Sequence, residues 1–258
     1  MISMFKKINT TLKSIGFDIL KLYNGLRLLP RFFYDYNNFI KKSKWDHVIN
    51  PQLFDNGTEG AIYGEYFFQD IYVAKSIIKD NPKRHIDIGS RVDGFIALLS
   101  LNRFVEVLDI RPININIENI KFYQWDITKQ SDYYNNSCDC ISCLHTIEHF
   151  GLGRYGDTVD ADSWKLAFTN LSLILNNNGV FWLSTPIGIE RVEFNANRIF
   201  NPNTIIDFAI NLNLQLEEFA YFINDNVIKS DNIINDISKL SNLDYSLGIF
   251  KFRKINNL

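Results

Sequence analysis

The sequence of 258 residues is short of cysteine, of long apolar runs and of net charge. Its three cysteines, Cys138, Cys140 and Cys143, stand in one short segment, so they cannot form a disulfide framework, and no second Cys or His pair has zinc-finger spacing. No run of about 18 apolar residues occurs, which excludes a membrane-spanning helix. The formal net charge is −2, so we expect no nucleic-acid partner.

The start of the chain also lacks the features of a secretory signal. Residues 1–7 carry charge, but neither a long apolar block nor a small-residue cleavage site follows them. We therefore expect a cytoplasmic protein whose thiols stay reduced.

Positive charge is concentrated at the start of the chain. Residues 1–44 contain nine Lys and Arg side chains against Asp18 and Asp35, a charge of +7 that leaves −9 for the remainder. Apolar residues recur at helical spacing up to Leu26, so the pattern predicts a basic amphipathic helix that ends before Pro30. Packing on the chain's own domain is one interpretation of this helix. Peripheral attachment to a membrane or a partner protein is the other.

From Pro82 onward, short β-rich runs alternate with helical patterns. The runs are residues 85–88, 104–108, 120–123, 138–144, 180–184, 214–222 and 246–253. Helical patterns cover residues 62–79, 163–175 and 202–211. This alternation predicts an α/β fold with a mostly parallel seven-stranded sheet, helices on both faces and an antiparallel last strand. We divide the chain into a basic helical extension, 1–80, and an α/β domain, 81–258.

Acidic residues stand at the ends of the first three predicted strands. Asp87 precedes Gly89 at a strand-to-helix turn, where a glycine lets the backbone approach a ligand closely. Asp109 follows the second strand at the position from which a carboxylate accepts hydrogen bonds from a ribose. Asp126 follows the third strand beside Trp125. Each acid alone fits a solvated strand end, but together they favour adenosine recognition at this edge of the sheet.

The segment after the fourth strand has two interpretations. His145, Glu148 and His149 form a His-x-x-Glu-His sequence, which is the zinc motif of the inverzincins when it lies within a helix. Here an apolar strand leads directly into it, which favours the second interpretation, a set of acid–base groups at the strand end.

At a larger scale, residues 87–186 resemble a class I S-adenosylmethionine-dependent methyltransferase. The resemblance rests on the Asp-x-Gly turn, Asp109, Asp126, the His-x-x-Glu-His segment and the run LNNNGVFWLSTP at 175–186. The segments SCLHTIEHFGLGRYGD (142–157) and PIGIERVEFNANRIF (186–200) more narrowly resemble the methyltransferase-like family called domain of unknown function 268. In place of the glycine that usually follows two residues after Gly89, this chain has Arg91.

The resemblance implies a Rossmann-like fold, S-adenosylmethionine as the cofactor and a set of site residues. The expected cofactor-binding residues are Asp87, Gly89, Ser90, Asp109, Ile110, Asp126, Ile127 and Leu144. The expected catalytic residues are His145, Glu148 and His149, with His145 as the preferred base. The expected substrate-binding residues are Arg154, Tyr155, Arg191, Asn195 and Arg198.

Three functions remain open from the sequence. The first is methylation of a small-molecule or glycan acceptor, with O-methylation favoured and surface polysaccharide biosynthesis as the setting. The second is a non-catalytic cofactor-binding or interaction module, which Arg91 motivates. The third is a metal-assisted version of the methyltransferase that uses a divalent cation at the His–Glu–His segment; no residue is assigned as a metal ligand.

Overall fold

The computed structural model describes residues 10–13, 16–41, 64–114, 116–130, 134–153, 155–194 and 196–256. The chain forms two compact units, Met1–Ile62 and Tyr63–Leu258. The second unit begins earlier than the boundary at 80/81 that the sequence suggested. Helix α3 (Glu65–Asp80) belongs to it, because Val73, Ala74 and Ile77 are buried there.

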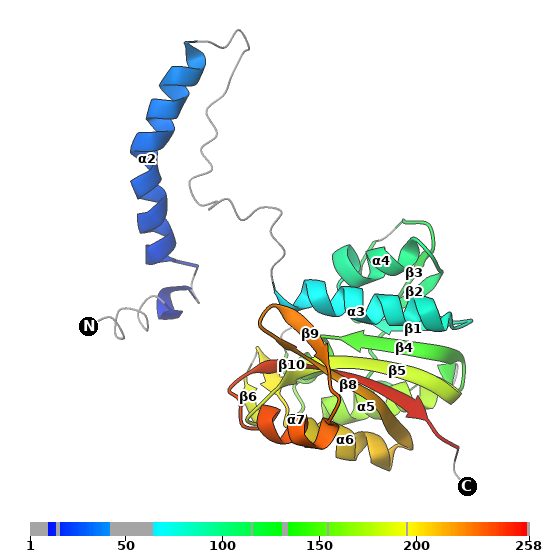
Figure 1. Cartoon of the computed structure of the whole chain (residues 1–258). Coiled ribbons are helices and arrows are strands. Elements are labelled where there is room, and N and C mark those ends of the chain that lie inside the picture. The colour runs from blue at the N-terminus through cyan, green and yellow to red at the C-terminus, as the bar shows by residue number, and fades with distance from the viewer. Residues whose placement is uncertain are drawn as a thin grey trace. The chain divides into compact units, whose positions relative to one another are not determined.

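The first unit contains helix α2 (Ile19–Ile40) (Figure 1). The prediction of one helix that ends before Pro30 is wrong at both ends. Residues 10–13 are helical, but Gly16 adopts a φ of +87° and Asp18 then caps a new helix by accepting a hydrogen bond from Lys21 N at 3.0 Å. Pro30 lies inside α2. Proline removes one hydrogen-bond donor and crowds the carbonyl of the residue four positions earlier, but the helix continues on both sides of it.

The second unit contains an eight-stranded sheet. Its strands are β1 (His85–Ile88), β2 (Val105–Asp109), β3 (Ile120–Gln124), β4 (Cys138–Leu144), β5 (Leu175–Ile187), β8 (Leu214–Ile223), β9 (Asn226–Lys229) and β10 (Ser246–Lys254). They follow the order β3-β2-β1-β4-β5-β10-β8-β9. Strands β1 to β5 pair in parallel, whereas β10 is antiparallel to both β5 and β8.

This topology confirms the predicted mostly parallel Rossmann-like sheet with an antiparallel last strand, and it adds strands that the sequence analysis missed. The eighth strand, β9, forms a hairpin with β8 through Asn224 and Asp225, which both have positive φ values. Such an Asn-Asp pair is typical of a two-residue hairpin turn, so the signal was present. The short strands β6 (Arg191–Glu193) and β7 (Asn197–Ile199) form a separate hairpin.

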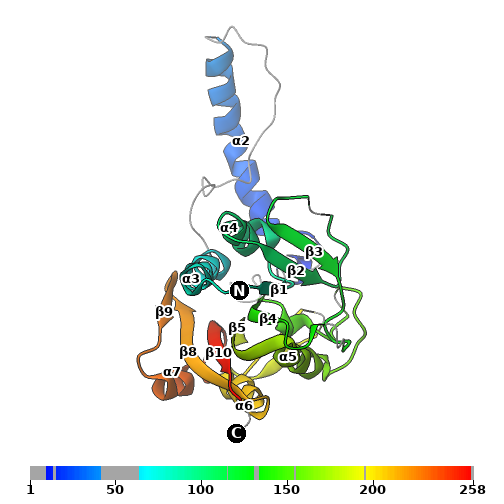
Figure 2. The same ribbon diagram turned by 90° about the vertical axis from the view of Figure 1, so that its right-hand side faces the viewer.

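Helices cover both faces of the sheet (Figures 1 and 2). One face carries α3, the π-helical turn Val92–Ile96 and α4 (Ala97–Ser100). The other carries α5 (Ser163–Ile174), α6 (Pro202–Asn211) and α7 (Ile233–Leu240). Side chains of β5 alternate between the two cores: Phe181 and Leu183 pack with α5, whereas Trp182 packs with α3. Strands β1, β2 and β4 are therefore buried on both sides, and ligands can reach them only at their ends.

Among the described residues, no helix combines the length and the apolar character needed to cross a membrane.

Candidate functional site

A cavity of about 570 Å³ opens at the carboxyl ends of β1, β2, β3 and β4. Its walls include Gly89 after β1, Asp109 at the end of β2, Trp125 after β3 and Leu144 at the end of β4. The chain runs outward from β1 to β2 and β3, and then returns to β4 on the other side of β1. The cavity thus lies where the strand order reverses, which is the usual ligand site of an open α/β sheet.

The turn after β1 requires its glycine. Gly89 has a φ of +64°, and a Cβ atom there would lie 2.6 Å from Thr146 Cγ2. The amide of Gly89 donates to Leu108 O at 3.0 Å, and Ser90 Oγ accepts from Leu144 N at 3.2 Å. These bonds fix the turn against both β2 and β4.

Asp87 lies behind this turn and does not line the cavity, unlike the expectation for a cofactor-binding residue. It is fully buried, and it accepts hydrogen bonds from Ser90 N (3.0 Å), Ser90 Oγ (2.7 Å) and Ser142 Oγ (2.5 Å). Burial raises its pKa to about 7, although the hydrogen bonds from Ser142 and Ser90 act in the opposite direction. Asp87 supports Ser90, which does line the cavity.

Asp109 lines the cavity, but Arg111 already contacts it. Arg111 N donates to Oδ1 at 2.8 Å, and the guanidinium lies 2.5 Å from Oδ2 through Nη2. The same guanidinium stands 5.2 Å from the centre of the Tyr155 ring. The Arg111 side chain is about half exposed, so it covers this carboxylate from the solvent side.

The end of β3 contributes an acid and an aromatic wall. Asp126 Oδ1 accepts from Thr128 N (3.0 Å) and Thr128 Oγ1 (2.6 Å), which leaves Oδ2 with Lys129 Nζ at 3.7 Å. Trp125 stacks on Tyr134 with 4.9 Å between ring centres. Other cavity residues predicted from the sequence are Ile110 and Ile127.

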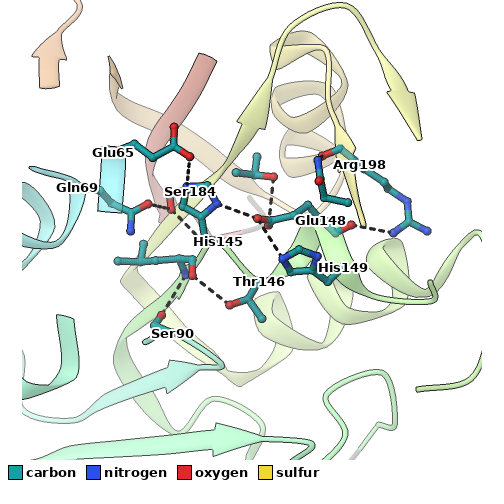
Figure 3. A network of polar contacts seen from close by, with 12 residues as sticks. Glu65, Gln69, Ser90, His145, Thr146, Glu148, His149, Ser184 and Arg198 are labelled. Carbon is teal, nitrogen blue, oxygen red and sulfur yellow. Dashed lines mark hydrogen bonds and ion pairs between the residues drawn. The ribbon is translucent and has the colours of Figure 1, made fainter. Parts of the chain in front are cut away.

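His145 faces a pair of carboxylates (Figure 3). It follows β4 with a φ of +51°, its Nδ1 lies 3.0 Å from Glu148 Oε1, and its Nε2 lies 3.3 Å from Glu65 Oε1 at the start of α3. Burial alone lowers the pKa of His145, but Glu148 and Glu65 outweigh it and raise the pKa to about 9. At neutral pH the ring is therefore an imidazolium. That state is the opposite of the neutral base expected from an ordinary histidine.

Glu148 is 1% exposed and does not line the cavity. Besides His145, its carboxylate lies 3.5 Å from Thr185 Oγ1. The tyrosine ring of Tyr66 packs 4.3 Å from the His145 ring, and Tyr245 donates a hydrogen bond to Glu65. Glu65, His145 and Glu148 thus form a mostly buried group of charges, called here the buried ion cluster, of which His145 borders the cavity.

His149 has a different environment, four residues further along the chain. Its Nδ1 lies 2.6 Å from the carbonyl oxygen of Ala196, which can only accept, so Nδ1 carries the proton. The remaining nitrogen, Nε2, holds the lone pair and lies 3.8 Å from Glu148 Oε1. His149 lines the cavity, and its ring meets that of Tyr155 edge-on at 5.5 Å.

Of the five residues expected to bind the substrate, the structure places one in the cavity wall. Tyr155 lines the cavity, whereas Arg154 and Asn195 lie outside the described residues. Arg191 lies away from the cavity and pairs with Glu193 and Asp244 at 3.0 and 3.2 Å.

Arg198 is 5% exposed and lies beneath the loop after β4. Its guanidinium donates to three main-chain carbonyls, of Glu148 (3.3 Å), Phe150 (2.5 Å) and Ala161 (3.2 Å). Figure 3 shows the bond to Glu148. An anionic ligand would have to replace all of these buried bonds, so Arg198 holds the loop in place and does not face a substrate.

Several cavity residues were not assigned to the site by the sequence analysis, among them Tyr66, Arg111 and Thr146. Tyr66 comes from α3, which the sequence placed in the extension, so no local signal could have found it. Arg111 stands two residues beyond Asp109 and could have been found, since a cation near a strand-end acid is a plausible partner for it.

The His-x-x-Glu-His segment does not form the helix that the inverzincin motif needs. Only Ile147–His149 form a single 3-10 turn, and His145 stands before it at the end of β4. Within the part of the chain that the structure describes, no group of three or more His, Cys, Asp and Glu residues is arranged to hold a metal ion.

Comparison with known proteins shows the fold and the family. The α/β unit resembles solved structures at low identity. The cyclase SpnF is 11% identical, with a TM-score of 0.54, over 73% of this chain and 81% of that one. The YcgJ protein of Bacillus subtilis is 12% identical, with a TM-score of 0.51, over 72% of this chain and 100% of that one. A protein provisionally assigned as a sarcosine dimethylglycine methyltransferase from Galdieria sulphuraria is 13% identical, with a TM-score of 0.52, over 74% of this chain and 85% of that one.

No curated protein matches the sequence. A family model does match it: the one described as Caenorhabditis protein of unknown function, DUF268, which covers residues 88–225, just over half of the chain. The chain therefore belongs to the DUF268 family, with a fold of the class I methyltransferase type.

Proposed function

We propose that this protein binds S-adenosylmethionine in the cavity and transfers its methyl group to a small-molecule or glycan acceptor. The observation that carries the proposal is the position of two carboxylates, Asp109 and Asp126, beside a glycine turn at the point where the strand order reverses. Methylation of oxygen is the favoured reaction. Surface polysaccharide biosynthesis is the setting that we predict for it.

The cavity has the size and the chemistry for an adenosine-containing ligand. Its volume of about 570 Å³ is within the range of small-molecule sites. Ile110, Ile113 and Trp125 offer apolar surface to a base, and Asp109 is placed to accept from ribose hydroxyls. An ionised carboxylate has about four lone-pair positions, so Asp109 can accept from ribose hydroxyls beside Arg111 or in its place if the half-exposed Arg111 side chain swings into solvent.

The proton chemistry assigns different roles to the two histidines. S-adenosylmethionine, when bound, supplies an electrophilic methyl group, and a hydroxyl acceptor must lose its proton as it attacks. His145 already carries a proton and has no lone pair to offer. His149 has its lone pair on Nε2, lines the cavity, and lies near the Glu148 carboxylate, which would stabilise the imidazolium that forms. We therefore propose His149 as the base and His145 as a fixed positive charge that holds Glu148 in place.

Arg91 favours a second candidate, a non-catalytic binding module, only weakly. Its guanidinium pairs with Asp93 (2.9 Å) and lies 5.4 Å from the centre of the Tyr66 ring. The side chain thus has partners of its own in the cavity wall.

Calorimetry and a product assay test the proposal. Titration with S-adenosylmethionine and S-adenosylhomocysteine should show saturable binding to a single site, with ATP as the control for a general nucleotide pocket. Incubation with nucleotide sugars should then release S-adenosylhomocysteine. Absence of binding by both cofactor forms would reject the proposal, and binding without turnover of any acceptor would favour the non-catalytic module.

A further inference from the structure

Helix α2 presents two chemically opposite stripes. Residues at helical spacing on one side form the apolar stripe: Leu22, Leu26, Leu29, Phe33 and Tyr36. Residues on the other side form the polar stripe: Asn24, Arg27, Arg31, Asp35 and Asn38. Positions three, four and seven residues apart share a helix face, so each stripe runs along the whole helix.

The apolar stripe is not buried within its unit. Leu22, Leu26 and Phe33 are 42%, 54% and 50% exposed. In the described part of the first unit, residues 10–13 are the one other helical segment, and a single turn is too short to cover a helix of 22 residues. An apolar surface of this length normally marks a site of attachment.

The charge around the stripe is strongly positive. Residues 1–44 carry +7 while the rest of the chain carries −9. On the polar stripe, Arg31 lies 3.6 Å from Asp35, and Arg27 lies 5.7 Å from the centre of the Tyr23 ring. Further lysines stand on both sides of the helix in the sequence: Lys6, Lys7, Lys13, Lys41, Lys42 and Lys44.

We propose that α2 lies flat in the surface of an anionic lipid bilayer, with the apolar stripe among the acyl chains and the basic residues at the headgroups. A helix of 22 residues is about 33 Å long and, lying in the plane, offers its whole stripe to the lipid. Its aromatic residues Tyr23, Phe33, Tyr34 and Tyr36 are of the kind that prefer the membrane–water interface. A protein partner would need a matching groove, whereas a bilayer matches both the apolar stripe and the positive charge.

Vesicle binding by the full-length chain tests this proposal. The protein should co-sediment with phosphatidylcholine vesicles that contain phosphatidylglycerol, and much less with phosphatidylcholine alone. Binding should weaken at least tenfold when the salt concentration rises from about 0.05 M to about 0.5 M, because the electrostatic attraction is then screened. Arg27→Gln with Arg31→Gln should weaken binding about tenfold to thirtyfold, the effect expected for two basic residues near the surface.

Two pairs of glutamate substitutions separate insertion from simple attraction. Leu26→Glu with Phe33→Glu changes the charge of the apolar stripe by −2, and Asn24→Glu with Asn38→Glu makes the same change on the polar stripe. The first pair should weaken binding at least tenfold more than the second, while circular dichroism and the thermal unfolding of both match the parent. Equal loss in the two pairs, no binding of the parent, or a stripe-dependent dimer in sedimentation would each overturn the proposal. The test is independent of the proposed enzyme activity.

Discussion

Two groups of side chains around the loop after β4 use the same residue types for different purposes. On one side, each group of the buried ion cluster has a charged partner, and His145, although it borders the cavity, has a carboxylate beside each ring nitrogen. On the other side, Asp109 and His149 face a cavity of about 570 Å³. A histidine or an acid is available for ligand chemistry only where its partners leave a lone pair or a carboxylate oxygen accessible.

A comparison of Arg198 with Arg111 leads to the same conclusion. Arg198 is held by three carbonyls in the interior, whereas Arg111 holds a carboxylate at the cavity edge with its side chain half exposed. Sequence alone favoured Arg198 as a ligand-binding cation. Burial and saturation of its donors give it a structural role, and Arg111 is the cation that meets the cavity.

Of the changes proposed here, replacement of His149, the proposed base, should have the largest effect, and that effect should be on turnover. His149→Ala should lower turnover about 10²–10⁴-fold, the usual loss for a general base, with nearly unchanged cofactor affinity. The measurement is the turnover of the variant and the parent under the same conditions, once an acceptor is known. An unchanged rate would remove His149 from the mechanism.

Removal of one charge from the buried ion cluster should lower the stability of the folded protein. Glu148→Gln leaves the His145 imidazolium with a single carboxylate partner in the interior, and the free energy of unfolding should fall by about 3 kcal/mol. Urea denaturation measures this loss. Glu217→Gln provides the matched control, because Glu217 pairs with Arg253 near the surface and its loss should cost about 0.5 kcal/mol or less. Equal effects of the two changes would mean that the cluster contributes no more than a surface pair.

On the cavity side, Asp109→Ala should weaken S-adenosylmethionine binding by about 1.5–3 kcal/mol, the scale of lost charge-assisted hydrogen bonds. Asp139→Ala makes the same chemical change in β4, where Asp139 accepts from Arg84 N and Asn176 Nδ2 outside the cavity. Calorimetry should find the affinity of this control close to that of the parent. The assignment of the ribose to Asp109 fails if both variants bind alike.

The pH dependence of stability should sharpen the comparison further. The pKa of His145 is raised from an ordinary 6.5 to about 9, so the folded state holds its proton more tightly than the unfolded chain. Its stabilising contribution is complete below about pH 6.5 and is lost as the pH rises through about 9. The free energy of unfolding should therefore fall by about 2 kcal/mol between pH 7 and pH 9. His145→Gln should flatten this slope, and an unchanged slope in that variant would assign the titration to another group.

The fold was accessible from the sequence because its signals are local. The limits of β1, β4 and α6 agree with the predicted runs. Short β-rich runs between turn residues mark the two strands, and Asn201 with Pro202 marks the start of α6. Strand β9 was missed because four half-exposed residues give almost no apolar pattern, although the Asn-Asp turn before it was readable. Pro30 was overinterpreted as a helix end, because a proline costs a helix one hydrogen bond and a close contact with the preceding turn, about 3 kcal/mol, and that cost does not by itself end a helix.

By itself, the sequence determined the sheet, the glycine turn and the places where acids follow strands, because strand period and turn chemistry act over a few residues. The tertiary structure alone decided what those residues can do. It buried Asp87 behind the turn, placed Glu65 of α3 against His145 and so kept the imidazole protonated, and placed His149 in the cavity wall with its Nδ1 on the carbonyl of Ala196. Protonation and accessibility depend on which distant groups meet in space, and a pattern along the chain carries no record of that.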